Sequence, residues 1–283
     1  MQDPDESLNA ENIKRNLATC YVGQNVVCFA STDSTNRVAK ELARNGAAEG
    51  TLVIADSQTG GRGRLNRQWL APAGSSLLMS VIFRPQLTPL QTMRVTMVCS
   101  LAIADAIEEL TALRVQLKWP NDIVIGGRKL AGILCELGLQ ANQLDFVVVG
   151  MGVNVNLDFQ DELQQYPADN APDTAQASLR SLPARSTSLS QELGQPLARL
   201  HLLHTLLPRI ERRYDRLKAG WIPNDEWKQR LETLHRVVTV TSDQQRITGQ
   251  AEDVDADGAL LLRLPDGSVT RILAGDVTLR TSV

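Results

Sequence analysis

The sequence predicts an α+β protein, with a mixed sheet flanked by helices and a small all-β unit at the C-terminal end. Up to residue 235, apolar runs of strand length alternate with stretches of helical spacing, and the longest stretch keeps Leu193, Leu200 and Leu207 on one stripe. From residue 236, short strands alternate with turns, and the Asp-Gly pairs at 257–258 and 266–267 are strong hairpin signals. We therefore expect an N-terminal extension at 1–25, a main domain at 26–235 and a small β-barrel at 236–283.

Strand-like and helical segments follow one another through the main domain. Strands are expected at 26–30, 51–55, 77–83, 115–125, 128–136 and 146–156. Helices are expected at about 13–17, 34–44, 91–110 and 193–217. Ser34 or Thr35 fits the N-cap of the second helix, and Gly46 fits its end. Residues 158–190 are rich in Pro, Asp, Ser and Gln and are expected to form a loosely ordered connection.

Composition restricts the class of protein. The chain has 283 residues, 43% of them hydrophobic, and a net charge of −3, so we expect a folded core and no general nucleic-acid binding. The four cysteines are far apart and lack metal-ligand spacing, which is typical of thiols in a reducing compartment. The acidic, polar N-terminus lacks the apolar core of a leader peptide. No apolar run reaches the roughly 18–20 residues of a membrane span. We therefore expect a cytoplasmic protein that binds no membrane.

The run from Ser57 to Trp69, Ser-Gln-Thr-Gly-Gly-Arg-Gly-Arg-Leu-Asn-Arg-Gln-Trp, is the strongest candidate for a binding element. It follows the predicted strand 51–55 and so leaves the end of a sheet. Its three glycines permit positive φ angles and close approach of the backbone. Arg62, Arg64 and Arg67 carry guanidinium groups, which bind phosphate or carboxylate oxygens through paired donors. Such a run alone also fits a solvated loop, but the features that follow favour an anion-binding loop.

Two lysines lie inside apolar strands. Burying Lys118 or Lys129 is costly without an anionic partner, and Asp122 lies close to both in sequence; a lysine can also extend to the sheet edge. Between the lysines, Trp-Pro interrupts the strand and Gly-Gly at 126–127 predicts a hairpin. A second feature is Ser-Thr-Asn at 34–36, where a strand end meets a helix N-terminus. Free amides at such a terminus can hold an anion, although a simple cap is the commoner use.

The chemistry that remains is cationic. The chain lacks a Walker lysine loop, a Gly-x-Ser-x-Gly elbow, an His-Glu-x-x-His helix and a Cys/His pair, and His201 and His204 have no third metal ligand nearby. Fixed cations suit a reaction that brings anions together, such as attack of a carboxylate on the α-phosphorus of a nucleotide. Two like charges about 4 Å apart repel by roughly 4 kcal/mol at an effective dielectric constant of about 20. Cations offset this repulsion and stabilise the charge that develops on the phosphate.

Five motifs in the same order resemble the biotin–protein ligase family, from about residue 26 to the C-terminus. They are Ser34-Thr35-Asn36, Gln58 with the Gly61-Arg62-Gly63-Arg64 loop through Arg67 and Trp69, Lys118-Trp-Pro-Asn-Asp122, Arg128-Lys129-Leu-Ala-Gly132 and Gly150-x-Gly-Val-Asn154. The resemblance implies a class II synthetase-like catalytic domain followed by an SH3-like barrel. It also implies an ATP-dependent enzyme that forms biotinyl-5'-AMP, with Mg²⁺, and transfers biotin to a lysine of a biotin carboxyl carrier protein.

The resemblance also implies roles for residues. Lys129, Arg64, Asp122 and Lys118 would form the catalytic set, with Lys129 between the biotin carboxylate and the α-phosphate. Asp122 would also act near Mg²⁺ or the incoming lysine. Contacts to biotin, ATP or the adenylate would come from Ser34, Thr35, Asn36, Gln58, Gly61, Arg62, Gly63, Arg64, Arg67, Trp69, Lys129, Gly132 and Asn154. Trp69 and Asn154 would hold the adenine, and Gly132 would let the backbone approach biotin.

One departure and three alternatives remain. The second Gly-Arg pair of the loop is replaced by Asn66-Arg67, and asparagine tolerates left-handed backbone better than most residues. Lipoate–protein ligase shares the broad fold and the two-step logic. A biotinyl-AMP-responsive regulator would need a helix-turn-helix, and only about 25 residues precede the first predicted strand. A non-catalytic biotin-binding module would not need the lysine and arginine set. We expect no DNA binding, and the resemblance leaves a homodimer open.

Overall fold

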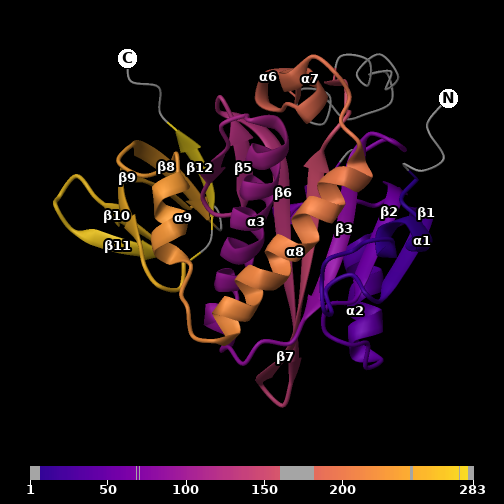
Figure 1. Ribbon diagram of the computed structural model, residues 1–283. Helices are drawn as coiled ribbons and strands as arrows, with labels where there is room; N and C mark the ends of the chain where they lie inside the picture. The colour runs from indigo at the N-terminus through magenta and orange to yellow at the C-terminus, as the bar shows by residue number, and fades with distance from the viewer. Residues whose placement is uncertain are drawn as a thin grey trace.

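A computed structural model describes residues 7–67, 69, 71–159, 182–242, 245–273 and 275–279 of the chain. Two sheets organise these residues: a seven-stranded sheet in the order β1-β2-β3-β7-β6-β5-β4, and a five-stranded sheet in the order β11-β10-β9-β8-β12. Helices α3 and α8 run across one face of the large sheet, and the small sheet lies at its side (Figure 1). The predicted α+β class is therefore confirmed.

The first half of the chain builds one edge of the large sheet. Helix α1 (Ala10–Lys14) precedes β1 (Val26–Thr32), α2 (Thr35–Arg44), β2 (Leu52–Gln58) and β3 (Ser76–Phe83). The β1–β2 pair is parallel and the other pairs of this sheet are antiparallel, which makes the sheet mixed as predicted. Ser34 stands at the N-cap of α2, but its side chain makes no capping hydrogen bond.

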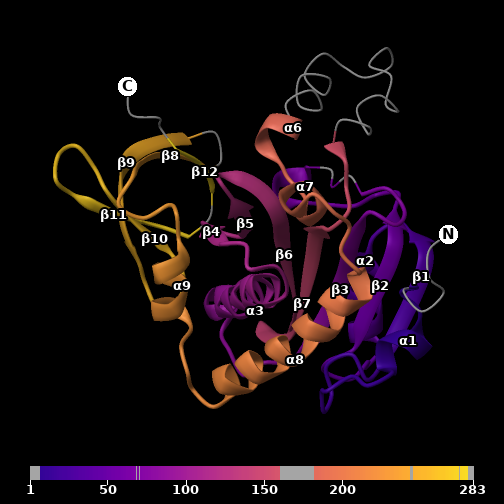
Figure 2. The same cartoon turned by 45° about the horizontal axis from the view of Figure 1, so that its top comes forward.

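Helix α3 (Met93–Thr111) is the core helix of this domain. By length and composition alone, residues 89–111 are apolar enough to cross a membrane, a candidate that the sequence analysis did not flag. In the structure, 72% of the apolar window is buried inside the protein. Its apolar length is therefore used against the sheet and against α8 (Arg199–Lys218), the other long helix of that face. Figure 2, which views α3 nearly along its axis, shows both helices on the same side of the sheet.

The middle strands form the predicted hairpins, although β6 ends later and β7 ends earlier than predicted. Strands β4 (Gln116–Lys118) and β5 (Asp122–Ile125) flank the Trp-Pro interruption, and the Gly-Gly turn leads into β6 (Arg128–Gln140) and then β7 (Gln143–Asn154). Both glycines of that turn have positive φ, as the hairpin requires. The predicted loose connection is partly wrong, because α6 (Leu182–Arg185) and α7 (Leu189–Leu193) are helical; residues 160–181 lie outside the described residues. Helix α9 (Asn224–Arg230) was not predicted.

Two apolar layers lie on opposite faces of the large sheet. On β7, Val149, Met151 and Val153 face the core beneath α3 and α8. The alternate residues face α2, where Val148 and Ile82 pack against Ala39. This alternation gives the α2 face fewer bulky side chains near the ends of β6 and β7, and it is on that face that most of the predicted site residues lie.

The small sheet consists of β8 (Val237–Ser242), β9 (Gln245–Val254), β10 (Leu260–Arg263), β11 (Val269–Ile272) and β12 (Asp276–Leu279). All of its pairs are antiparallel, which agrees with an SH3-like unit. Among the described residues no strand pair joins β11 to β12, so the unit is a sheet rather than a closed barrel. It is fastened to the main domain, since the buried Trp119 indole donates to the Gly258 carbonyl at 2.9 Å and Arg94 pairs with Asp257.

Candidate functional site

A buried polar network lies between the start of α2 and the large sheet. The Thr35 amide and hydroxyl both donate to Gln58 Oε1, at 2.7 and 3.1 Å. Ser80 Oγ lies 2.8 Å from Thr35 Oγ1 and 2.6 Å from Asn36 Oδ1. Thr35, Asn36 and Ser80 are all buried. Because these groups come from rigid elements and satisfy one another, their donors and acceptors have fixed directions before any ligand arrives.

Glu136 extends this network to the rim of the sheet. Asn36 donates its Nδ2 to Glu136 Oε2 at 2.9 Å, and Lys40 Nζ lies 2.7 Å from Glu136 Oε1. Burial opposes ionisation of this carboxyl, but the hydrogen bonds from Lys40 and Asn36 hold its pKa below the usual value. The positive charge of Arg62 also lowers the pKa of Glu136, by a smaller amount, so this loop arginine lies near the network. Glu136 is therefore a fixed anion at one end of the site.

Three glycines leave room beside the network. A Cβ on Gly150 would lie 2.1 Å from Asn36 Oδ1, and a Cβ on Gly152 would lie 2.7 Å from the Trp69 ring. Gly132 pairs with Gly152 across β6 and β7, and a Cβ there would meet both Trp69 and Lys129 at 3.0–3.1 Å. These strands thus offer bare backbone to the α2 face. At Gly132 the close neighbours in the structure are Trp69 and Lys129, and the predicted approach of its backbone to biotin stays a prediction.

The arginine loop, residues 60–69, closes on itself through backbone hydrogen bonds. The Trp69 amide donates to the Gly61 carbonyl at 2.9 Å, and the Gly63 amide donates to the Arg67 carbonyl at 2.7 Å. The predicted use of positive φ at the loop glycines is wrong, since the residue with positive φ is Leu65, at 55°. Asn66 does not take this role either. Gly61 is needed because a Cβ there would lie 2.7 Å from the Trp69 carbonyl oxygen.

Two loop arginines point toward the C-terminal sheet. Arg64 Nη1 donates to Asn121 Oδ1 and to the Gly275 carbonyl, each at 3.2 Å, and lies 3.9 Å from Asp276. Arg67 forms an ion pair with the same Asp276 carboxylate. Burial lowers the pKa of Arg64, although Asp276 and Asp122 act against that effect. The loop is therefore held by β12 at its arginine end.

Lys129 lies where the loop, the glycines and the β4–β5 turn meet. Its Nζ is 2.7 Å from Asp122 Oδ1 and 5.3 Å from the centre of the Trp69 ring, close enough for a cation–π contact. Trp69 Nε1 is buried and has no hydrogen-bond partner in the part of the chain that the structure describes. A buried donor without a partner costs about 1–3 kcal/mol. The Trp69 indole therefore covers Gly132 and Gly152 at the cost of an unpaired N–H. A ligand that accepted a hydrogen bond from this N–H would remove the cost.

The remaining predicted residues are less closely involved. Lys118 is half-buried and stands opposite Asp122 in the β4–β5 hairpin. Lys118 forms no ion pair with any of the described residues. Asn154 is buried and donates to the Thr187 carbonyl at 3.0 Å. The amide of the same Thr187 donates to the Lys129 carbonyl. The predicted cap Ser34 is buried next to the network, and its amide donates to Asp33.

Sequence reasoning missed Ser80, Glu136 and Asp276. A signal existed for the first two, because each is a polar residue with apolar neighbours on both sides in its strand and lies on the same face as the strand glycines. No signal marked Asp276, which reaches the loop only through the packing of the small sheet against the main domain. Among the described residues no group of three or more His, Cys, Asp or Glu side chains could hold a metal ion.

Comparison with known proteins decides the family. Residues 28–154 match the Biotin/lipoate A/B protein ligase family, and residues 233–280 match the biotin protein ligase C terminal domain. The chain is 33% identical over 280 residues to the bifunctional ligase/repressor BirA of Bacillus subtilis, covering 96% of this chain and 79% of that protein. The chain belongs to the biotin protein ligase family.

Other members agree in sequence and in fold. The biotin–[acetyl-CoA-carboxylase] ligase of Paracoccus denitrificans is 32% identical over 243 residues, which are 84% of this chain and 94% of that protein. The biotin protein ligase of Aquifex aeolicus, solved in complex with biotin and ATP, superposes with a TM-score of 0.72 at 28% identity. That superposition covers 92% of this chain and all of the Aquifex chain. These relatives are named as biotin ligases, so biotin is favoured over lipoate as the substrate that is activated.

Proposed function

We propose that this protein joins biotin to ATP to form biotinyl-5'-AMP and then transfers the biotinyl group to a lysine of a biotin carboxyl carrier protein. The observation that carries the proposal is the position of Lys129, at the junction of the arginine loop, the paired glycines and the β4–β5 turn. A long apolar ligand that ends in a carboxylate fits this arrangement, because its ring would meet fixed hydrogen-bonding groups and its carboxylate would meet a lysine.

The first step joins two anions. A carboxylate oxygen of biotin attacks the α-phosphorus of ATP, a new P–O bond forms, and the bond to the β-phosphate breaks to release pyrophosphate. Lys129 and Arg64 are the cations that we assign to the carboxylate and the α-phosphate. They offset the repulsion between the reactants and stabilise the charge on the transferring phosphate. No protein nucleophile is required.

The second step moves the biotinyl group to the carrier. The neutral amine of the carrier lysine attacks the acyl carbon, the C–O bond to AMP breaks, and the amine loses a proton as the amide forms. Asp122, which lies 2.7 Å from Lys129, is the carboxylate that we assign to the incoming ammonium. Named relatives act on acetyl-CoA carboxylase, which supports a carrier domain of that enzyme class as the partner.

Magnesium fits the site only together with a nucleotide. Mg²⁺ usually takes one or two protein carboxylates and completes its shell with phosphates and water. Asp122 is the carboxylate that we assign to it, in agreement with the lack of a larger acidic cluster among the described residues. When bound, the ion would neutralise phosphate charge beside Lys129 and Arg64.

The other ligand contacts are proposed in two groups. Thr35, Asn36, Gln58 and Ser34 are assigned to the ring end of biotin, where the network already fixes their directions. Gly61, Arg62, Gly63, Arg67, Trp69 and Asn154 are assigned to the adenylate. We assign residues 26–235 to the catalytic unit, residues 236–283 to the C-terminal unit and residues 1–25 to an N-terminal extension.

We propose a cytoplasmic ligase that does not bind operator DNA. The net charge of −3 gives the chain no general electrostatic attraction to phosphates. A gel shift with the promoter region of the biotin-synthesis genes, at low salt with biotin and ATP, should show no specific complex. A biotin-dependent shift would overturn this assignment. Light scattering on the same samples measures the oligomeric state and tests for a homodimer.

Exchange of labelled pyrophosphate into ATP tests the adenylation step. Purified protein should catalyse exchange when biotin is added and should not when lipoate is added, because the ring end of the site is built from fixed polar groups. Labelling of a purified carrier domain at its lysine tests the transfer. Exchange with lipoate but not biotin, or with neither, would contradict the proposed function.

A further inference from the structure

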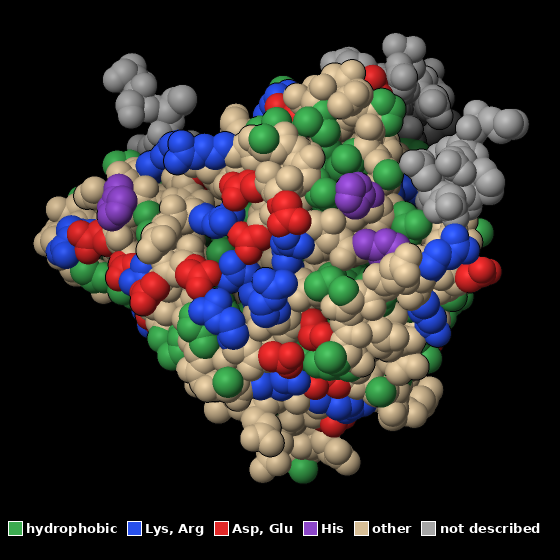
Figure 3. All heavy atoms as spheres, in the orientation of Figure 1, with side chains coloured by type: hydrophobic (Ala, Val, Ile, Leu, Met, Phe, Trp, Pro, Cys, Tyr) green, Lys and Arg blue, Asp and Glu red, His purple; other side chains and the backbone are tan. Residues whose placement is uncertain are grey.

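The face opposite to the proposed active site carries a charged pocket that biotin ligation does not use. It is lined by Asp105 and Glu109 of α3 and by Arg209, Arg212, Arg213 and Arg216 of α8, and it has a volume of about 300 Å³. The arginines follow a spacing of three and four residues, which places them on one stripe of the helix. Figure 3 shows blue and red side chains gathered near the middle of this face, over α3 and α8.

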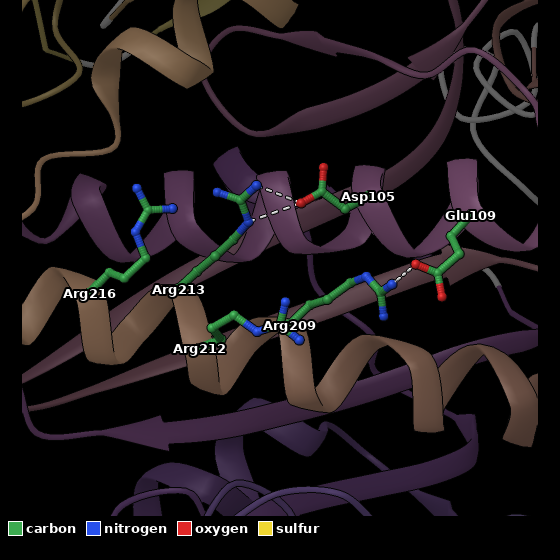
Figure 4. A pocket seen from close by; sticks show the side chains of 6 residues that line it. All are labelled: Asp105, Glu109, Arg209, Arg212, Arg213 and Arg216. Carbon is green, nitrogen blue, oxygen red and sulfur yellow. Dashed lines mark hydrogen bonds and ion pairs between the residues drawn. The ribbon is translucent and has the colours of Figure 1, made fainter.

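The two carboxylates in the pocket are already engaged. Asp105 accepts from Arg213 through two nitrogens, at 2.5 and 3.0 Å, and from Arg230 at 2.7 Å. Glu109 forms an ion pair with Arg209. Figure 4 shows the pairs of Arg213 with Asp105 and of Arg209 with Glu109, and no dashed line reaches Arg212. Arg209 and Arg213 thus hold α8 to α3. The other two lining arginines, Arg212 and Arg216, are the outer ones and do not pair with these carboxylates.

Of the two outer arginines, Arg216 has an acidic partner outside the pocket lining, whereas Arg212 has none among the described residues. Arg212 is exposed and has no ion pair or hydrogen bond among the described residues. Arg216 reaches Glu226 at 3.2 Å, and its guanidinium lies 3.9 Å from the centre of the Trp221 ring, a stacked position that restrains it. Burial, together with the charges of Arg212 and Arg213, lowers the pKa of Arg209 against the opposing effect of Asp105. The lining therefore keeps an excess of positive charge.

From this geometry we infer a binding site for a compact polyanion that carries two linked phosphate groups. Guanidinium groups bind phosphate oxygens through paired donors, and two arginines four residues apart can each take one group. A volume near 300 Å³ is the lower end of the range for small-ligand pockets, so a diphosphate fits and a whole large cofactor does not. The diphosphate has two sources, free pyrophosphate and the tail of a nucleoside diphosphate.

The test uses isothermal titration of the full-length protein with pyrophosphate at low salt. The wild type should show binding that Arg212→Gln weakens at least about tenfold, since the substitution removes a charge-assisted contact and no protein partner. Arg44→Gln, an exposed arginine on α2 on the other face, is the matched control and should leave binding unchanged. Lys129→Ala should keep this binding event even if adenylation is lost, which separates it from product binding at the proposed active site.

Further arms identify the ligand. Binding of ADP that is lost in Arg212→Gln assigns the site to a nucleotide tail, and binding of pyrophosphate without ADP assigns it to the free diphosphate. Wild-type affinity in Arg212→Gln overturns the proposal, and so does complete loss of binding in Lys129→Ala. Sulfate binding as tight as pyrophosphate binding would also overturn it, because a site for two phosphates should prefer the longer anion.

Discussion

The polar network and the arginine loop are two halves of one proposed site, and they are built in different ways. The network lies on α2, β2, β3 and β6, and its side chains are buried or half-buried and hydrogen-bonded to one another. The loop has few internal hydrogen bonds, a left-handed leucine, and arginines whose partners belong to the C-terminal sheet. One half is formed without ligand, whereas the other is held by contacts that a phosphate would replace.

This difference assigns separate tasks to the two halves. A site for a neutral, shaped group gains from donors and acceptors that are already oriented, because no ordering cost is then incurred on binding. A site for a nucleotide must open to load it and close to exclude water, so a weakly held loop is the suitable element. In the ligand-free structure Asp276 pairs with Arg67 and lies 3.9 Å from Arg64, the arginines that we assign to the adenylate and the α-phosphate.

The largest expected effect comes at the junction between the halves. Lys129→Ala should lower biotin-dependent pyrophosphate exchange by about 10²–10³, the cost of removing one transition-state contact. Lys14→Ala, an exposed lysine on α1, is the control and should retain full exchange. Exchange near the wild-type rate in Lys129→Ala would remove the lysine from the chemistry.

The network should respond in stability. Ser80→Ala removes a fully buried hydroxyl and leaves Asn36 Oδ1 without its partner, so the free energy of unfolding in urea should fall by about 1–3 kcal/mol. Ser57→Ala, on the neighbouring strand β2, loses only a long bond to a carbonyl at 3.3 Å and should change stability little. Equal stability of the two variants would mean that the network is not preformed.

A pH series tests the charged end of the network. The pKa of Glu136 is lower in the folded protein than its usual value of 4.5, so its contribution to stability is complete above pH 4.5 and is lost as the pH falls through the folded-state pKa. Glu136→Gln should therefore destabilise the protein by about 1 kcal/mol at neutral pH and less at low pH. A difference between mutant and wild type that grows on acidification would contradict the assignment.

The smallest effect is expected at the loop contact with β12. Asp276→Asn weakens a partly exposed ion pair, which is worth about 0.2–1 kcal/mol. Exchange of the Gly63 and Arg67 amides with solvent should become about two- to fivefold faster in the ligand-free protein. Asp266→Asn, in a turn of the same sheet, is the control. Unchanged exchange in Asp276→Asn would show that β12 does not restrain the loop.

The sequence predicted the elements whose pattern is local. Apolar runs gave β1, β2, β3 and β7, and the paired glycines located the β5–β6 turn. Helix α9 was missed because it is only seven residues long, and α7 because its five residues lie in a polar segment. The predicted end of β6, at residue 136, was too early. The strand continues through a bulge between Gly138 and Leu139, where pairing with β7 and not hydrophobicity extends it.

The site was predicted from motifs, and its internal contacts were not. The ion pair of Lys129 with Asp122 could be anticipated because both flank one turn. The position of Trp69 over Gly132 and Gly152 could not, because it depends on how the loop folds back through the bond from Trp69 to Gly61. Leu65 carries the left-handed backbone that glycine and asparagine propensity assigned elsewhere. Tertiary contacts override local preference at such positions.

The bond from Trp119 to Gly258 bears on how chains of this family can be recombined. A chimera cut between residues 235 and 236 would bring a foreign C-terminal sheet to a turn that already carries Lys118 and Asp122. Unless the incoming sheet presents a carbonyl at the position of Gly258, the indole N–H stays buried and unpaired, at about 1–3 kcal/mol. Unless it presents an acid at the position of Asp276, the loop loses its anchor. A chimera that replaces the C-terminal unit should therefore keep both contacts to remain as stable as the parent chain.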